Sequence, residues 1–187
     1  MKIIGIGGTN GSGKDTLANM LADDYGWLFV SGSDILRKEL TKRHLPIERE
    51  NLRELSAEWR RQHSLGYLID KAVEIFMPQK NRYTGLAISS LRNFGEAERV
   101  HELGGQIIWV DATPKLRYER IYSRRRSAED KKSFEQFLAE EKAEMSHSGD
   151  EATLNMAAVR DMADIFITND DNDIEKFKET AQKALKL

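Results

Sequence analysis

The chain has 187 residues, and its 29 Lys and Arg nearly balance its 31 Asp and Glu, which leaves a formal net charge of −2. This length predicts one domain, because domains usually contain about 100–200 residues. The balanced charge excludes a global field that attracts nucleic acid or an anionic membrane, so any anion site has to be local. The absence of cysteine excludes disulfides, thiolate zinc sites and a cysteine nucleophile, and fits a reducing compartment.

No segment has the composition of a membrane anchor. The first apolar run, at residues 3–6, lacks a preceding basic region, and no stretch approaches the roughly 20 apolar residues that a membrane span requires. We therefore expect a cytoplasmic protein, without a membrane partner, that works as a monomer or homodimer.

Short apolar segments alternate with longer segments of helical periodicity, a rhythm typical of parallel βαβ units. We expect strands at residues 2–7, 27–30, 84–89, 106–111 and 164–168. We expect helices at residues 14–25, 34–43, 48–62, 65–77, 94–103, 114–124, 151–160 and 173–187. No repeat or linker divides the chain, so the sequence predicts an α/β fold in a single domain.

A strand, a glycine-rich turn and the start of a helix follow one another at residues 3–16. Glycine permits backbone conformations in which successive N–H groups converge on a phosphate at a helix N-terminus, and Lys14 adds a positive charge. This context predicts a P-loop for the β- and γ-phosphates of ATP or a close relative, and disfavours a glycine-rich turn with an incidental lysine. The candidate nucleotide-binding residues are Gly8, Asn10, Gly11, Ser12, Gly13, Lys14, Asp15 and Thr16.

The residue after Lys14 departs from the usual motif. A Ser or Thr hydroxyl normally follows and reaches Mg²⁺, whereas Asp15 stands here and Thr16 comes next. Both are candidate Mg²⁺ ligands. Asp15 could equally be an acidic residue that favours the positive end of the helix dipole.

The acceptor side is predicted after the second strand, because ligands of parallel sheets bind beyond the carboxyl ends of the strands. Asp34 could orient an acceptor hydroxyl, take its proton or hold Mg²⁺, and Arg37 could grip a phosphate. Alternatively, Ser33 caps a helix, Asp34 interacts favourably with the positive end of the helix dipole, and Arg37 is solvated.

The third strand ends at Ser89, where many P-loop proteins place an aspartate that holds the metal's water shell. Arg92 follows in the strand-end turn, where a planar guanidinium suits a phosphate. Its alternative is a surface arginine that caps a loop. We take Arg92 as a catalytic and substrate-binding candidate beside Lys14 and Asp34.

A basic cluster, Arg117, Arg120, Arg124, Arg125 and Arg126, precedes a glutamate-rich stretch at residues 135–144. The region predicts an exposed helical flap. Cations at such a flap stabilise the charge of phosphoryl transfer and exclude water. Because at least two of the five arginines are expected to pair with nearby acids, Arg120 and Arg124 are the catalytic candidates.

Together these motifs resemble the nucleoside monophosphate kinase group of P-loop kinases, with adenylate kinases, dephospho-CoA kinases and phage-type deoxynucleoside monophosphate kinases, and an archaeal-type kinase-like family. The resemblance covers residues 7–16, 33–37, 91–98, 110–126 and 163–169, of which the first block is strongly specific. It implies a three-layer α/β/α P-loop NTPase fold with a five-stranded parallel sheet, a helical acceptor-binding region at about 34–77 and a lid at about 124–149. It also implies that Asn169 lies near adenine.

The expected function is an ATP- and Mg²⁺-dependent phosphotransferase whose acceptor is a nucleotide or nucleotide-like small molecule. One alternative is a dephospho-CoA kinase-like enzyme, in which Asp34 lies beside the acceptor hydroxyl. Another is a nucleotide-dependent regulatory ATPase with a protein partner, suggested by the missing carboxylate at Ser89. An RNA-binding role is disfavoured because no basic stripe with interleaved aromatic residues is present.

Overall fold

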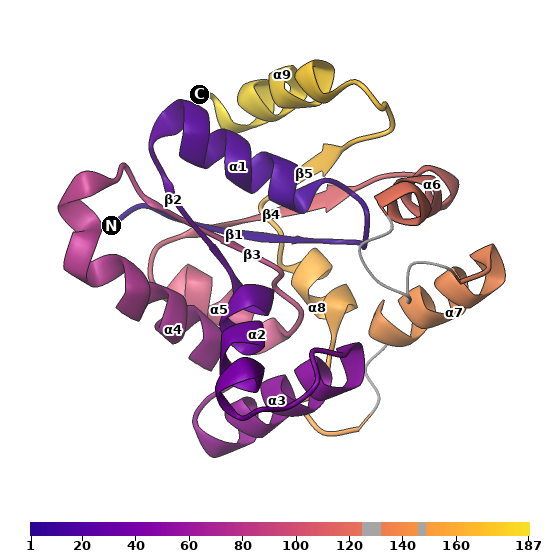
Figure 1. The fold of residues 1–187 in the computed structure, drawn as a ribbon. Helices are drawn as coiled ribbons and strands as arrows, with labels where there is room; N and C mark the ends of the chain where they lie inside the picture. The colour runs from indigo at the N-terminus through magenta and orange to yellow at the C-terminus, as the bar shows by residue number, and fades with distance from the viewer. Residues whose placement is uncertain (125–131, 146–148) are drawn as a thin grey trace.

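The computed structural model describes residues 1–124, 132–145 and 149–187, with only the backbone for Arg124 (Figure 1). Five parallel strands form one sheet in the order β2-β3-β1-β4-β5. The strands are β1 (Ile3–Gly8), β2 (Leu28–Ser31), β3 (Leu86–Ser89), β4 (Gln106–Asp111) and β5 (Ile165–Thr168). The central strand β1 pairs on both sides, so that Ile4 lies opposite Ala87 and Gln106. The predicted five-stranded parallel sheet is confirmed.

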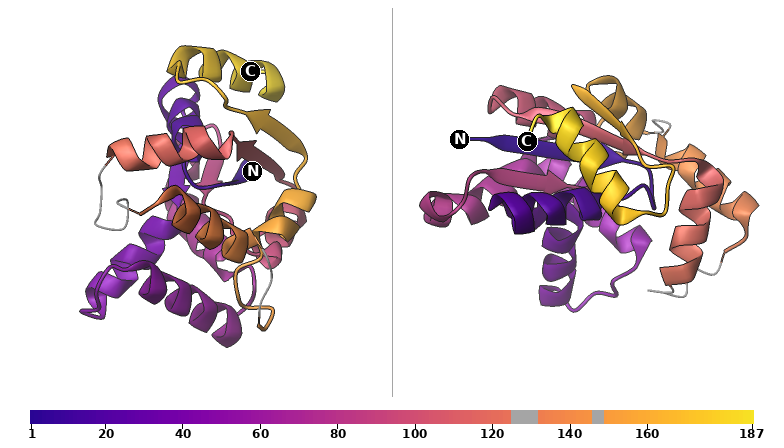
Figure 2. Two further views of the ribbon diagram at one scale, coloured as in Figure 1. Left: turned by 90° about the vertical axis from the view of Figure 1, so that its right-hand side faces the viewer. Right: turned by 90° about the horizontal axis from the view of Figure 1, so that it is seen from above.

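Helices cover both faces of the sheet (Figures 1 and 2). One face carries α1 (Lys14–Tyr25) and α9 (Ile174–Leu185), and the other carries α4 (Tyr67–Phe76), α5 (Phe94–Glu102) and α8 (Met156–Asp161). Side chains alternate along β1, so Ile6 packs against Leu17 in one core while Ile3 belongs to the core on the opposite face. The predicted three-layer α/β/α fold is confirmed.

Four further helices lie at or beyond the carboxyl ends of the strands or beside them. They are α2 (Gly32–Lys42), α3 (Arg49–Gln62), α6 (Pro114–Arg124) and α7 (Phe134–Met145). A separate apolar cluster that includes Leu40, Leu55 and Trp59 packs α2 against α3. Both α6 and α7 lie beyond the carboxyl ends of the strands (Figure 2). A 3₁₀ helix, η1 (Met77–Arg82), was not predicted.

Two predicted segments differ from the structure. The helix expected from residue 151 begins at Met156, because Asn155 caps it and accepts a hydrogen bond from the Ala158 N–H. The helix expected as an exposed flap is present as α7, but Phe137 and Glu144 are each only 3% exposed. The rest of the predicted flap, at 125–131 and 146–148, with Arg125 and Arg126, lies outside the described residues.

No helix among residues 1–124, 132–145 and 149–187 is long and apolar enough to cross a membrane.

Candidate functional site

The turn from β1 to α1 has a backbone shape that only glycine accommodates at two positions. Gly11 and Gly13 have φ values of 80° and 105°. A Cβ atom at Gly11 would approach the Arg117 carbonyl to 2.7 Å, and one at Gly13 would approach Asn169 Nδ2 to 2.5 Å. The turn is therefore packed closely between α6 and the end of β5.

Three hydrogen bonds hold this turn in place: two join it to other elements and one lies within it. Thr9 Oγ1 donates to Asp111 Oδ1 at 2.6 Å, which ties the turn to the end of β4. Asn169 Nδ2 donates to the Ser12 carbonyl at 2.8 Å, and the Ser12 hydroxyl donates to the Thr9 carbonyl at 2.8 Å. The backbone N–H groups of the loop are thus preorganised, as phosphate binding at a helix N-terminus requires.

The ammonium group of Lys14 is bound by carbonyl oxygens. Its Nζ donates to the carbonyls of Gly8 at 2.9 Å and Thr9 at 2.6 Å. Burial, and then the positive charge of Arg92, lower the pKa of Lys14 to about 7. A lysine destabilised in this way gains most from an anionic partner, so the loop fits the terminal phosphates of a nucleotide.

The first turn of α1 carries the candidate metal ligands. Asp15 and Thr16 both line the cavity in front of the loop. Ser89, at the end of β3, donates a hydrogen bond to Asp15 Oδ1 at 3.3 Å. Within the described residues no three His, Cys, Asp or Glu side chains cluster as a metal site. One carboxylate and one hydroxyl still fit Mg²⁺, because this ion usually takes its other ligands from phosphates and water.

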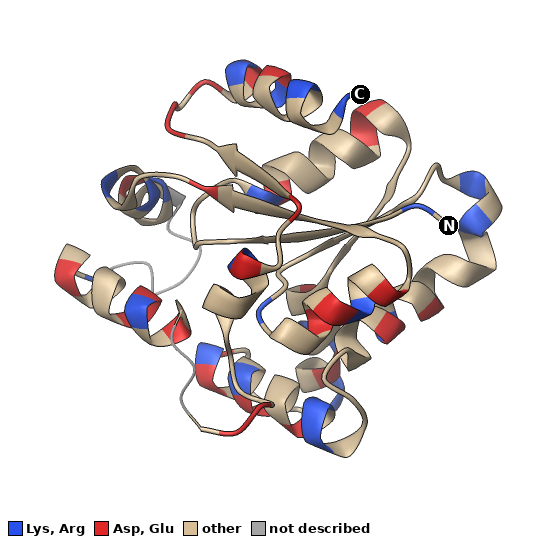
Figure 3. Ribbon diagram, turned by 180° about the vertical axis from the view of Figure 1, so that it is seen from behind, with Lys and Arg blue, Asp and Glu red and all other residues tan. Residues whose placement is uncertain are grey.

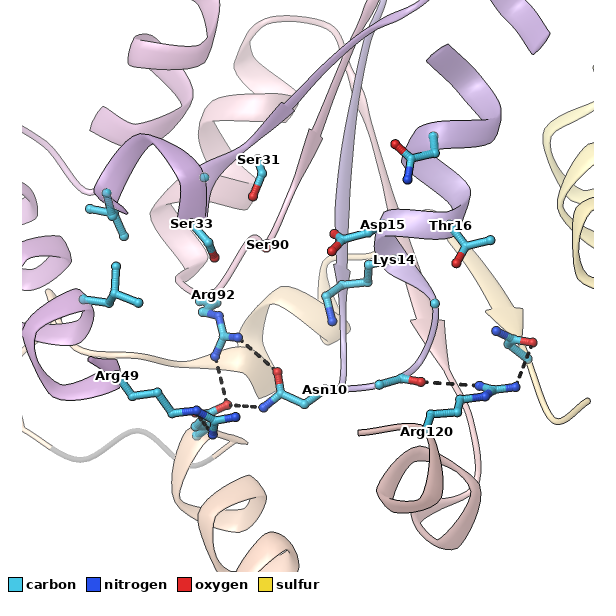
Figure 4. Close-up of a pocket in the computed structure, with 18 of the residues that line it drawn as sticks. Asn10, Lys14, Asp15, Thr16, Ser31, Ser33, Arg49, Ser90, Arg92 and Arg120 are labelled. Atoms are coloured by element: carbon cyan, nitrogen blue, oxygen red, sulfur yellow. Dashed lines mark hydrogen bonds and ion pairs between the residues drawn. The ribbon is translucent and has the colours of Figure 1, made fainter. Parts of the chain in front are cut away.

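A single cavity of about 910 Å³ joins the phosphate loop to the helices on the acceptor side (Figure 4). One part is lined by the loop and the elements after β5, with Gly11, Gly13, Lys14, Thr16, Asn169, Ile174 and Phe177. The other part is lined by α2, α3 and the turn after β3, with Ser33, Arg37, Arg49, Arg53, Arg60, Ser90 and Arg92. This volume lies at the upper end of the range for small-molecule sites, about 300–1,000 Å³.

Arg92 belongs to a cluster of polar side chains at the boundary between the two parts. Its guanidinium donates to Glu144 Oε2 at 2.9 Å and to Asn10 Oδ1 at 3.1 Å. Asn10 Nδ2 and Arg53 Nη2 also donate to the Glu144 carboxylate, at 3.1 and 2.7 Å. The Nη1 atom of Arg49 lies 4.0 Å from the same carboxylate. Donors from the P-loop, α3 and the turn after β3 therefore meet at one anion, the Glu144 carboxylate of α7.

The backbone at Arg92 is held by a buried ion pair. Its N–H donates to Glu96 Oε2 at 2.7 Å. The Glu96 side chain pairs with Arg60 at 2.6 Å, and both side chains are 2% exposed. Arg60 also donates to the Ala152 carbonyl at 2.8 Å. This pair fixes the strand-end turn relative to α3.

Two of the three arginines of α6, Arg117 and Arg120, have different surroundings. Arg117 is 2% exposed, pairs with Glu141 of α7, and donates to the Ala112 carbonyl at 2.7 Å. Arg120 lines the cavity and donates to the Gly11 carbonyl at 3.4 Å and to Asn169 Oδ1 at 3.3 Å. The side chain of Arg124, the other catalytic candidate of the basic cluster beside Arg120, lies outside the described residues.

The position of Asp34 corrects one expectation. Its side chain is 61% exposed, accepts a hydrogen bond from Arg37 at 2.7 Å, and is not among the cavity-lining residues of the described chain. The reason is that α2 begins at Gly32, so Gly32 and Ser33 face the cavity while Asp34 turns to solvent. Arg37 does line the cavity, as expected.

Comparisons with known proteins show which families this chain belongs to. A family model described as an AAA domain matches residues 4–146. A UPF0200 protein of Sulfurisphaera tokodaii is 31% identical over 187 residues, covering 100% of this chain and 97% of that protein. The chain belongs to the AAA domain family and to the UPF0200 family. A second UPF0200 protein, from Methanococcus vannielii, is 27% identical over 100% of this chain and 96% of its own length.

The UPF0200 chain resembles several solved structures in its fold. A shikimate kinase from Bacteroides thetaiotaomicron has a TM-score of 0.64 at 15% identity, over 99% of this chain and 98% of that one. A shikimate kinase from Acinetobacter baumannii, in complex with shikimate, has a TM-score of 0.51 at 15% identity, over 99% and 93%. These likenesses confirm a P-loop kinase-like fold.

Several residues of the UPF0200 site were not predicted. Arg49, Arg53 and Arg60 of α3 line the cavity, and their spacing of four and seven places them on one helical face. That spacing was a usable signal in the sequence. Glu144 carried no such signal, because it is one of several glutamates at 135–144.

Proposed function

We propose that this UPF0200 protein is an ATP-dependent phosphotransferase that acts on a nucleotide or nucleotide-like small molecule. The observation that carries the proposal is the single cavity that joins a P-loop to an arginine-rich surface. A hydrolase needs room for water at the terminal phosphate, whereas this cavity extends well beyond the P-loop to Arg49, Arg53 and Arg92. Such a surface suits an anionic second substrate.

In this mechanism the loop amides and Lys14 bind the β- and γ-phosphates, and Arg92 and Arg120 neutralise charge that develops during transfer. An acceptor oxygen bonds to the γ-phosphorus as the bond to the bridging oxygen of ADP breaks, so the products are ADP and a phosphorylated acceptor. Asp15 and Thr16 would hold Mg²⁺, which when bound neutralises phosphate charge. Asn169 and the nearby Phe177 would lie on the nucleoside side of ATP.

The proposed subgroup is the nucleoside or deoxynucleoside monophosphate kinases. The dephospho-CoA kinase alternative loses its main support, because Asp34 is exposed and paired with Arg37. The regulatory ATPase alternative was based on the missing carboxylate at Ser89. Asp15 lies within hydrogen-bonding distance of that serine, so a carboxylate is available at the strand end.

The test is an ADP-release assay with Mg-ATP and a panel of nucleoside monophosphates, deoxynucleoside monophosphates and dephospho-CoA. We expect one class of monophosphate to stimulate release, and we expect Lys14→Ala to lower turnover at least about a hundredfold. Arg61→Gln is a charge-matched control on the exposed side of α3. Slow ADP release that no acceptor accelerates would count against the proposal.

A further inference from the structure

The Glu144 carboxylate has the surroundings of a bound ligand. It is 3% exposed, yet it lies at the edge of the cavity rather than in an apolar core. Arg92, Arg53 and Asn10 donate hydrogen bonds to it at 2.9, 2.7 and 3.1 Å, and Arg49 Nη1 lies at 4.0 Å. These donors come from three separate elements and converge on one oxyanion (Figure 4).

More positive charge surrounds this carboxylate than a single ion pair would supply. Three guanidinium groups surround one carboxylate, and Arg49 shares its charge with Glu140 at 3.0 Å. Burial alone raises the pKa of the Glu144 carboxyl, but the charges of Arg92 and Arg53 outweigh it and hold the pKa at about 2. Forked donors of this kind also match a phosphate, which carries more charge and more acceptor oxygens than a carboxylate.

The helix that supplies Glu144 is separate from the elements that supply its partners. In Figure 3 one acidic end of α7 lies beside basic segments of α3, and Glu141 of α7 pairs with Arg117 of α6. The arginines stay on α3 and on the turn after β3, whichever anion they bind, and all three line the cavity. An anion that enters the cavity therefore has to compete with Glu144 for the same donors.

We propose that Arg49, Arg53, Arg92 and Asn10 form the binding site for a phosphate monoester of the acceptor, and that Glu144 occupies this site when the acceptor is absent. The inference rests on the proposed function only in assigning the phosphate to an acceptor. The site adjoins the P-loop through Asn10, so a phosphate bound there lies next to the nucleotide site. An acceptor phosphate then binds only if it interacts with these donors more strongly than the Glu144 carboxylate does.

The experiment measures binding of inorganic phosphate by calorimetry in a Lys14→Ala background, which weakens phosphate binding at the P-loop. We expect Glu144→Gln to tighten phosphate binding by about tenfold or more, because it removes the competing charge. Glu135→Gln, which removes the same charge from the exposed first turn of α7, is expected to change it less than about twofold. Adding Arg53→Gln to Glu144→Gln is expected to abolish the gain.

A second variant covers the case in which Glu144→Gln folds poorly. Glu144→Asp keeps the charge but shortens its reach, so an intermediate gain is expected. The proposal is overturned if phosphate binds the Glu144 variants no more tightly than their parent, or if the gain persists without Arg53. Tighter binding of acetate than of phosphate would also overturn it. Nucleotide binding by the chain with Lys14 intact is measured separately, so failure of the proposed function is distinguishable from failure of this inference.

Discussion

Ser89 donates a hydrogen bond to Asp15 across 3.3 Å, and so joins the end of β3 to the first turn of α1. Ser89 is 1% exposed, whereas Asp15 lines the cavity. A carboxylate therefore lies near the place where many P-loop proteins carry an aspartate on the strand itself. The two departures from the usual motif, at positions 15 and 89, are therefore in direct contact.

This relationship predicts that Asp15 carries the response to Mg²⁺. Asp15→Asn should weaken the apparent Mg²⁺ affinity of the nucleotide complex by about tenfold, because a carboxylate ligand is lost while the amide keeps its size. The measurement is a Mg²⁺ titration of nucleotide binding by fluorescence or calorimetry. Ser89→Ala is the control, with an expected change below about threefold. An unchanged Mg²⁺ titration for Asp15→Asn would exclude Asp15 as a ligand.

The low pKa of Lys14, about 7, predicts that nucleotide binding takes up a proton. In the free protein burial, and then Arg92 and Arg117, lower this pKa, whereas Asp15 and Glu144 raise it. Bound phosphates raise it further, because their negative charge stabilises the ammonium form. The affinity for a non-hydrolysable triphosphate should therefore be highest below pH 7 and fall as the pH rises through 7.

Calorimetry in buffers of different ionisation enthalpy measures this uptake. The terminal phosphate of the ligand also titrates at about pH 6–7, so the informative quantity is the difference in proton uptake between the unmodified chain and Lys14→Met. We expect this difference to be close to zero at about pH 5.5 and close to one proton at about pH 9. Equal uptake by the two proteins would contradict the assignment.

Asp34→Asn is expected to leave turnover within about twofold of the unmodified protein, because the side chain is 61% exposed and pairs with Arg37 at the surface. Steady-state kinetics with the acceptor identified in the screen provide the measurement. Arg53→Gln is the informative comparison, since it should raise the acceptor KM at least about tenfold with little change in the ATP KM. A large loss of turnover in Asp34→Asn would restore a catalytic role for this aspartate.

The buried pair Arg60–Glu96 predicts a stability effect. Glu96→Ala should lower the free energy of unfolding by about 3 kcal/mol or more, because Arg60 would remain buried without its partner. Denaturant unfolding measures the change. The double variant Arg60→Met with Glu96→Gln should recover part of the loss, since no charge stays buried and the Gln amide oxygen still accepts from the Arg92 N–H. A double variant as unstable as Glu96→Ala would contradict this explanation.

The parallel sheet and the phosphate loop could be predicted from the sequence alone. Both depend on local signals: apolar runs between turn residues predict the strands, and the glycines and Lys14 lie within residues 8–16. Contacts within one turn need no knowledge of the rest of the chain. The same local reasoning placed Arg92 and Arg37 at the cavity, where both are found.

Which charged groups face the cavity depends on contacts between distant parts of the chain. Glu144 meets Arg53 across 91 positions and Arg92 across 52, and Asp34 turns away because of where α2 begins. Residue type and spacing do not specify such pairings, because a charged side chain on a helix can be solvated or paired equally well until distant elements pack beside it. The anion site therefore depends on how α3, α7 and the end of β3 pack together.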